Sequence, residues 1–275
     1  MMEEKFRLIK SKTEEIENQT ADVADKIIYV SLINLAFLLD IIIVDSLKFR
    51  GVLKETDLEP FPKNLRGVVV SMNHQDGNEW IFVYRRCFKP IYFIAPWLVL
   101  KDLPRTWADR NNFLSSSLTK LVSKIMIPVD RNEDGSADVP FGESLEAAQS
   151  VGLVGFFEGH RTRKCPNLRY SKNGKALGEL SESLGIFAKK GMRIKAVWAE
   201  YKDTSLSSLP EDGIWRLRRF FSWYWRTLWK KNGEIHIVWG ETRKFENVEE
   251  KNSKELRKIA TLQFENYMLE LADQT

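Results

Sequence analysis

The sequence predicts an α/β domain in which helices flank a mostly buried mixed sheet, because short apolar segments alternate with longer amphipathic ones. The composition is that of a folded globular protein, with 43% hydrophobic and 29% charged residues. A length of 275 residues provides for one large domain with a complete hydrophobic core, or for two modest ones. The chain has no internal repeat and no low-complexity linker, so we expect a single α/β domain.

Six short apolar segments are predicted as strands. They are residues 67–72, 91–94, 124–128, 152–157, 194–199 and 235–239. Amphipathic stretches between and after them predict helices at residues 79–87, 112–123, 142–150, 174–189 and about 248–271. Strands that are apolar along their whole length are expected to be covered on both faces of the sheet.

The N-terminal part is predicted to be helical and membrane-associating. A polar stretch at residues 3–22 precedes an apolar run at 27–44, in which Asp40 is the one charged residue. As a helix this run would be about 27 Å long, slightly shorter than a hydrocarbon core of about 30 Å. Asp40 at mid-membrane would cost about 2.5–3.5 kcal/mol. An interfacial helix, a membrane span and a buried core helix all stay open.

A change of pattern after Pro60 and Pro62 divides the chain into a membrane-associating helical segment at residues 1–55 and an α/β domain at residues 56–275. The charged start does not have the apolar core of a cleaved signal peptide. The two cysteines are spaced neither as metal ligands nor as a disulfide framework, which fits a reducing compartment.

The first candidate site is the segment 73–79 (NHQDGNE), which directly follows a predicted strand, where ligands gather in open α/β sheets. On one helix, His74 and Glu79 would be about 140° apart. They can meet if His74 lies in a strand-to-helix turn, which Gly77 makes easy. A carboxylate beside one imidazole nitrogen raises the basicity of the other, as a general base requires. Alternatively, Asp76 and Glu79 are spaced as a helix-capping pair, and Asp76 is a rival partner for His74.

Two further predicted strand ends carry arginines, in the segments 127–131 (IPVDR) and 155–163 (GFFEGHRTR). A guanidinium group offers a fork of donors that matches phosphate oxygens. Either arginine alone is most simply explained by a surface salt bridge. Together with His74, they indicate one base and two phosphate-binding cations at strand ends.

The ordered set NHQDGNE, IPVDR and FFEGHRT, within residues 66–200, resembles the first three motif blocks of the 1-acylglycerol-3-phosphate acyltransferase family of glycerolipid acyltransferases. The resemblance implies that His74 is the base and Glu79 its orienting acid. It places around the acceptor phosphate the residues Arg131, Glu158, Gly159 and Arg161.

The chain also departs from the family pattern. Glu79 stands where aspartate is usual, Phe157 replaces a proline of the third block, and His160 replaces its threonine. The fourth block usually has a Val-Pro pair, but residues 194–197 (IKAV) lack the proline. These changes leave the chemistry intact and leave the identity of the acceptor open.

The implied reaction moves a fatty acyl group from acyl-CoA or an acyl carrier protein to the hydroxyl of a lysophosphatidate-like glycerolipid. No serine or cysteine nucleophile is evident, so we expect direct transfer, with no cofactor and no metal. The alternatives are an acyltransferase for glycerol 3-phosphate or another lysolipid, and a non-catalytic membrane-bound relative.

A basic aromatic stretch at residues 213–231 is predicted as an amphipathic helix at a membrane surface, since it holds six Lys or Arg, no acid and four tryptophans. The residues expected to contact the bilayer are Trp215, Arg219, Trp223, Arg226 and Trp229. A helix packed in the core is the alternative. A nucleic-acid partner is not expected, because no nucleic-acid motif accompanies the stretch. We therefore expect a membrane-associated protein whose active site is on the cytoplasmic side.

Overall fold

The computed structural model describes nine segments of the chain and five single positions. The segments are residues 38–75, 79–94, 98–110, 125–131, 137–158, 167–202, 215–229, 233–244 and 253–275, and the positions are 27, 31, 34, 35 and 165. The predicted polar arm at 3–22 and the predicted helix at 112–123 lie outside these residues.

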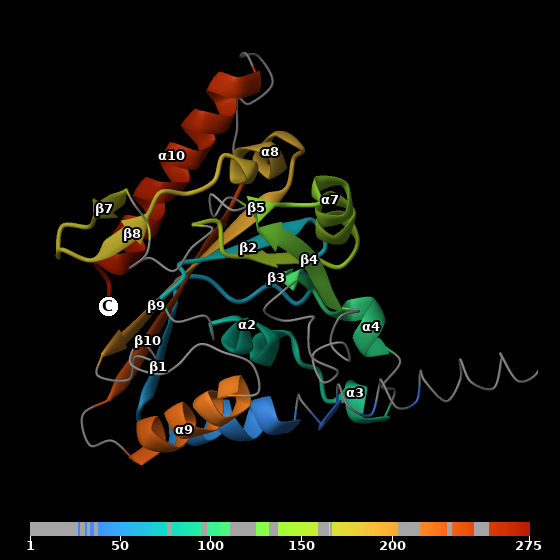
Figure 1. Cartoon of the computed structure of the whole chain (residues 1–275), viewed down its shortest axis with the longest axis vertical. Helices are drawn as coiled ribbons and strands as arrows, with labels where there is room; N and C mark the ends of the chain where they lie inside the picture. The colour runs from blue at the N-terminus through green and yellow to red at the C-terminus, as the bar shows by residue number, and fades with distance from the viewer. Residues whose placement is uncertain are drawn as a thin grey trace, which may run out of the picture.

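The described strands form an eight-stranded mixed sheet and a separate two-stranded hairpin (Figure 1). The sheet has the order β1-β10-β9-β2-β6-β3-β4-β5. Its strands are β1 (Leu53–Asp57), β2 (Val68–Met72), β3 (Arg105–Asp109), β4 (Met126–Arg131), β5 (Ala137–Asp138), β6 (Leu153–Gly155), β9 (Arg193–Lys202) and β10 (Glu234–Arg243). The five strands from β9 to β4 are parallel to one another, so their carboxyl ends share one edge.

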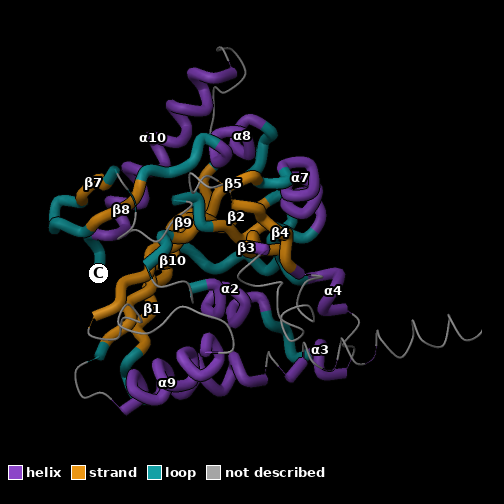
Figure 2. The backbone as a smooth tube through the Cα atoms, in the orientation of Figure 1, coloured by secondary structure: helices purple, strands orange, loops and turns teal. Residues whose placement is uncertain are grey.

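Helices cover both faces of the sheet, as Figure 2 shows. One core cluster joins the sheet to α7 (Phe141–Ser150), α8 (Ser183–Lys189) and α10 (Ser253–Ala272). The other joins it to α2 (Trp80–Cys87), α9 (Trp215–Trp229) and the N-terminal helix, by which we mean the helical residues 38–49. The predicted α/β architecture with a largely buried mixed sheet is confirmed.

Strand β2 shows why the apolar runs form central strands. All five of its residues are buried. Val68, Val70 and Met72 belong to one core cluster, and Val69 belongs to the other. Side chains of a strand alternate between the two faces, so a sheet covered on both sides favours apolar residues along the whole strand, and Ser71 is the one polar residue of β2.

Two predicted elements are wrong. The segment Ile91–Ile94 is the short helix α3, followed by α4 (Val99–Asp102). Pro90 precedes it, and proline favours the first turn of a helix over a central strand. The predicted helix 174–189 begins only at Ser183, because residues 176–178 pair with 168–170 as the hairpin β7 (Leu168–Tyr170) and β8 (Ala176–Gly178). Gly174, with φ of 76°, makes the turn between the two strands.

Three edge and near-edge strands were not predicted. β1, β3 and β5 contain charged residues and lack a continuous apolar run. β1 pairs with β10 from Leu53 to Asp57 and therefore crosses the predicted boundary at residue 55. None of the helices in the described part of the chain is long and apolar enough to cross a bilayer. The described N-terminal helix packs Ile43, Val44 and Leu47 into the core cluster that it shares with α2 and α9.

Candidate active site

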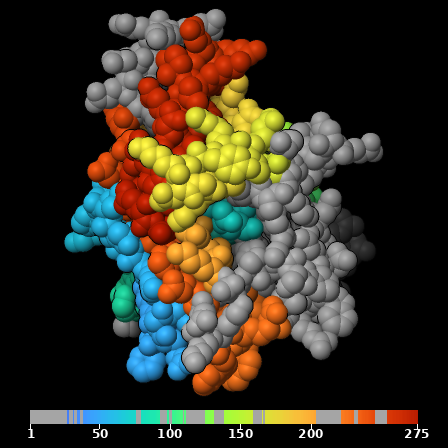
Figure 3. Space-filling view, turned by 90° about the vertical axis from the view of Figure 1, so that its left-hand side faces the viewer, coloured from blue at the N-terminus to red at the C-terminus, as the bar shows by residue number. Residues whose placement is uncertain are grey.

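The candidate base lies at the edge of the sheet where the parallel strands end. β2 stops at Met72, and His74 follows two residues later. Figure 3 shows the β2–α2 junction (teal) at the surface, between the β7–β8 hairpin (yellow) and the end of β9 (orange). The side chain of His74 is 17% exposed, so part of the ring faces solvent.

Glu79 lies beside the imidazole, as the turn geometry requires. Nδ1 of His74 is 3.7 Å from Oε2 of Glu79, whose side chain is fully buried. α2 begins at Trp80 with Glu79 as its N-cap residue, and the Glu79 side chain makes no capping hydrogen bond. Glu79 therefore does not occupy the third position of the helix, where a capping box formed with Asp76 would require it. Its carboxylate instead faces the base and would stabilise an imidazolium in a site of low dielectric. Asp76, the rival partner, lies outside the described residues.

The ring of Phe156, the residue after β6, orients the imidazole. The rings of His74 and Phe156 stack, with centroids 4.3 Å apart and an interplanar angle of 25°. Phe156 follows directly after β6, which is the neighbour of β2 in the sheet. Stacking of this kind is worth about 0.5–1.5 kcal/mol between aromatic rings and restricts rotation of the base.

Asn73 ties the backbone in front of the base to β9. Its side chain is buried, and Nδ2 donates to the carbonyl of Ala199 at 2.8 Å. Its Oδ1 accepts from the amide of the same residue at 2.6 Å. The side chain thus replaces a strand partner where the pairing of β2 with β9 ends.

Glu158 holds the base from the other side. Its Oε1 accepts the backbone N–H of His74 at 2.6 Å, and its Oε2 accepts the backbone N–H of Gly178 at 2.7 Å. The side chain is buried. Gly178 leaves room for this contact, since a Cβ there would lie 2.6 Å from Oε2 of Glu158. Glu158 is therefore a positioning residue for His74, and its place beside the acceptor phosphate stays a prediction.

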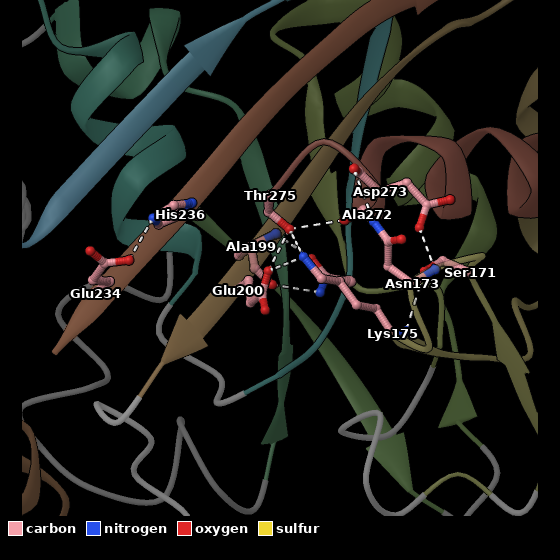
Figure 4. Close-up of polar contacts among 11 residues, drawn as sticks. Ser171, Asn173, Lys175, Ala199, Glu200, Glu234, His236, Ala272, Asp273 and Thr275 are labelled. Atoms are coloured by element: carbon pink, nitrogen blue, oxygen red, sulfur yellow. Dashed lines mark hydrogen bonds and ion pairs between the residues drawn. The ribbon is translucent and has the colours of Figure 1, made fainter. Parts of the chain in front are cut away.

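The β7–β8 hairpin that carries Gly178 is anchored in turn to the end of the chain (Figure 4). Lys175 contacts Glu200 of β9 at 2.5 Å, and both side chains contact Thr275. The backbone N–H of Asn173 donates to Asp273 at 2.9 Å. Glu158, which is 84 residues from His74 along the chain, therefore links the backbone of His74 to this anchored hairpin.

Neither cysteine is suited to be a nucleophile. Burial raises the pKa of Cys87 to about 12. Burial, together with the nearby Glu158 carboxylate, raises the pKa of Cys165 to about 11. Because the thiolate is the reactive form, both side chains are inert thiols at neutral pH. Among the described residues, no three His, Cys, Asp or Glu side chains gather in a way that could hold a metal ion.

The structure describes only some of the predicted phosphate-binding residues. Arg131 ends β4, three positions from β2 in the sheet. Adjacent strands are about 4.8 Å apart, so its backbone is roughly 14 Å from the strand of His74, at the same edge. The side chain of Arg131, and all of Gly159 and Arg161, lie outside the described part.

The predicted membrane contacts in α9 lie on two different sides of the helix. Trp223 is 1% exposed and belongs to the core cluster shared with α2. Its predicted contact with the bilayer is at odds with this burial, because a packed side chain cannot meet lipid. Arg226 is exposed and Trp229 is 58% exposed. The backbones of Trp215 and Arg219 are helical, and their side chains lie outside the described part of the chain.

Comparison with known proteins yields a likeness to solved structures and no match in sequence. No protein-family model matches the chain, and no curated protein sequence matches it. The fold is similar to the crystal structure of the 1-acyl-sn-glycerophosphate (LPA) acyltransferase PlsC from Thermotoga maritima. The match has a TM-score of 0.40 and 16% identity, and it covers 82% of this chain and 79% of the other. With so distant a likeness, the function has to be inferred from the site itself.

The role of Glu158 leads to a first prediction. Glu158→Gln places an NH₂ group against one of two backbone N–H donors, which costs about 1–3 kcal/mol of unfolding free energy when a buried donor is left unsatisfied. We expect urea unfolding to shift accordingly and kcat to fall, while KM for the acceptor stays unchanged. A rise in KM with unchanged kcat would show that Glu158 binds substrate. Glu179→Gln, at an exposed carboxylate of the same region, is the control.

Proposed function

We propose that this protein is an acyltransferase that moves a fatty acyl group from acyl-CoA or an acyl carrier protein to the hydroxyl of a lysophosphatidate-like glycerolipid. The observation that carries the proposal is the His74–Glu79 pair, 3.7 Å apart at the end of β2, within three motif blocks that occur in the family's order. The accessible imidazole and buried carboxylate are what a general base needs.

The reaction follows from this pair. Nε2 of His74, on the far side of the ring from Nδ1 and Glu79, removes the proton of the acceptor hydroxyl. The hydroxyl oxygen forms a bond to the thioester carbonyl carbon, and the tetrahedral intermediate collapses by breaking the carbon–sulfur bond. The thiolate then takes the proton from the imidazolium. The ester and a free thiol are the products, and Glu79 stabilises the imidazolium between the two proton transfers.

The phosphate of the acceptor supplies orientation. Arg131 and Arg161 are the proposed ligands, by resemblance to the family's second and third blocks. Fixing the hydroxyl near the thioester removes rotational and translational entropy from the chemical step, which can contribute several kcal/mol. The proposed acceptor is a lipid and resides in a membrane. We therefore propose that the enzyme is membrane-associated, with its active site on the cytoplasmic side.

The direct test is a product assay with labelled acyl-CoA and a panel of lyso-acceptors. We expect the label in the diacyl product of a phosphate-bearing acceptor. A panel in which no acceptor, including glycerol 3-phosphate, takes up label with either donor would refute the proposal and favour a non-catalytic relative.

Removal of one phosphate ligand should change acceptor choice. Arg161→Ala should raise KM for phosphate-bearing acceptors about tenfold to a hundredfold, since a hydrogen bond to a charged group is worth about 1.5–3 kcal/mol. Acceptors without phosphate should be used as before. An equal loss with both acceptor classes would contradict the assignment. Arg66→Ala, at an exposed arginine remote from the β2–α2 junction, is the matched control.

A further inference from the structure

A buried carboxylate outside the candidate active site is not explained by the acyl-transfer chemistry. Glu265 is part of α10, and its side chain is 7% exposed. Its neighbours in the helix, Phe264 and Met268, belong to the core cluster that joins α10 to the sheet. Taking a carboxylate out of water costs free energy, so an apolar side chain would fill this position more simply. Glu265 therefore needs an explanation other than packing.

The carboxylate of Glu265 binds the β7–β8 hairpin near its open end. Oε1 accepts the backbone N–H of Leu180 at 2.9 Å, and Oε2 accepts Nη1 of Arg169 at 2.5 Å. Arg169 is in β7, and Leu180 follows the end of β8 by two residues. Nη2 of Arg169 also donates to Oδ1 of Asn266 at 2.8 Å. One side chain of α10 thus ties β7 to the chain that leaves β8.

The segment 178–181 connects Glu265 with the candidate active site. All four backbone N–H groups of this segment have acceptors, at distances of 2.7–3.2 Å. The N–H of Gly178 donates to Oε2 of Glu158, and the N–H of Leu180, two residues later, donates to Glu265. Two buried carboxylates therefore hold one short stretch of backbone.

One more hydrogen bond joins this segment to the base. Oε1 of Glu158 accepts the backbone N–H of His74 at 2.6 Å, while its Oε2 accepts that of Gly178 at 2.7 Å. A shift of the segment 178–181 would therefore reach the backbone of His74 through a single buried side chain. A displacement of about 1 Å at a catalytic group can lower a rate about hundredfold.

The residue after α10 holds the same hairpin at its turn (Figure 4). The carboxylate of Asp273 accepts the backbone N–H of Lys172 at 3.2 Å and that of Asn173 at 2.9 Å. Figure 3 shows the hairpin (yellow) lying on α10 (red) beside the β2–α2 junction (teal). The hairpin is thus fixed at two points, and Glu265 is the one that holds the chain two residues from Gly178.

We propose that Glu265 is a positioning residue for His74. It fixes the chain after β8, so that the N–H of Gly178 holds Glu158 and Glu158 holds the backbone of the base. This inference rests on the proposed role of His74 in acyl transfer. A buried ion pair adds little net stability compared with apolar residues of similar volume, but the pair of Glu265 with Arg169 needs one arrangement of the hairpin. Its loss should therefore change kcat.

The first test is steady-state kinetics of Glu265→Gln in the full chain. We expect kcat to fall at least about tenfold, while KM for acceptor and donor stays unchanged, because Glu265 acts on the base and not on a substrate. Glu270→Gln, at an exposed carboxylate of the same helix, is the matched control and should have the kcat of the wild type. A wild-type kcat in Glu265→Gln, or a higher KM at unchanged kcat, would overturn the proposal.

A pair of variants separates positioning from stability. Glu265→Met leaves the Arg169 cation without its partner, whereas Arg169→Met/Glu265→Met removes both charges. The double variant should unfold at a higher urea concentration than the single one, because no unpaired charge is left behind. Its kcat should nevertheless stay as low, since the N–H of Leu180 has lost its acceptor in both. A kcat that recovers together with the stability would show that Glu265 only stabilises the fold.

Amide hydrogen exchange followed by NMR gives a measurement that needs no turnover. In Glu265→Gln the amides of His74 and Gly178 should exchange at least about tenfold faster than in the wild type, as expected when one hydrogen bond to a charged group is lost. The amide of Val238, in β10, should exchange as before. Unchanged exchange at His74 and Gly178 would overturn the proposal. A wild type that acylates no acceptor, with the faster exchange observed in Glu265→Gln, would refute the proposed function and leave the link between Glu265 and His74 standing.

Discussion

Replacement of His74 by alanine should abolish measurable acyl transfer, with kcat falling by a factor of at least about 10²–10⁴, the contribution of a positioned general base. The fold should persist, because the side chain is at the surface and its main packing contact is the stack on Phe156. Loss of that stack should cost about 0.5–1.5 kcal/mol. Product formation measured beside thermal unfolding of the same preparation tests both parts.

His236 is a matched control for this variant. It also lies next to a carboxylate, with Nε2 3.1 Å from Oε2 of Glu234, on β10 (Figure 4). His236→Ala should leave kcat unchanged. Glu79→Gln should lower kcat less than His74→Ala does and leave KM unchanged, because it removes only the charge that stabilises the imidazolium. Appreciable turnover by His74→Ala would refute the assignment of the base.

Stability should gain from Asp40→Asn, and the gain should grow with pH. Asp40 is 9% exposed, and neither of its carboxylate oxygens has a hydrogen-bond partner in the described part of the chain. Burial raises its pKa to about 8; the charge of Arg85 opposes this shift and that of Asp45 adds to it. An unfolded aspartate has a pKa of about 3.9. The folded protein therefore binds one more proton between these values, and the free energy of unfolding falls as pH rises from about 4 to about 8.

Asparagine cannot ionise, so the variant should lose this pH dependence. Urea unfolding at pH 5, 7 and 8.5 should show a stability difference from wild type that widens to several kcal/mol at the highest pH. Asp138→Asn, at an exposed carboxylate of β5, should run parallel to the wild type. Stability curves of Asp40→Asn and wild type that stay parallel across this range would show that Asp40 is not a buried acid.

Much of the sheet and the location of the base could be predicted because they depend on short stretches of chain. Strands covered on both faces need mostly apolar residues. β2 and β6 consist largely of them, and β9 and β10 have apolar, buried central parts between polar ends. His74 and Glu79 are only five residues apart, so a short stretch of chain is enough to bring them together. The four-residue run at 91–94 forms a helix and not the predicted strand, because so short an apolar run is compatible with either.

The environment of the base could not be read from the chain, because it is made by residues far apart in sequence. Glu158 reaches the backbone of His74 over 84 positions, and Asn73 reaches Ala199 over 126. Phe156 joins the site only because β6 happens to be the neighbour of β2. The family resemblance predicts only that Glu158 lies near the acceptor phosphate; its hydrogen bonds to the backbone N–H groups of His74 and Gly178 are visible only in the structure.

The same distinction holds for α9. Its composition alone indicates an amphipathic helix, since cations and aromatic rings alternate along residues 213–231. Which tryptophans face inward depends on where the sheet and the N-terminal helix lie. Trp223 is buried in the core cluster that α9 shares with the sheet and the N-terminal helix, whereas Trp225 and Trp229 are exposed. Residue types are local information, but the side of a helix that meets solvent is chosen by the elements against which it packs.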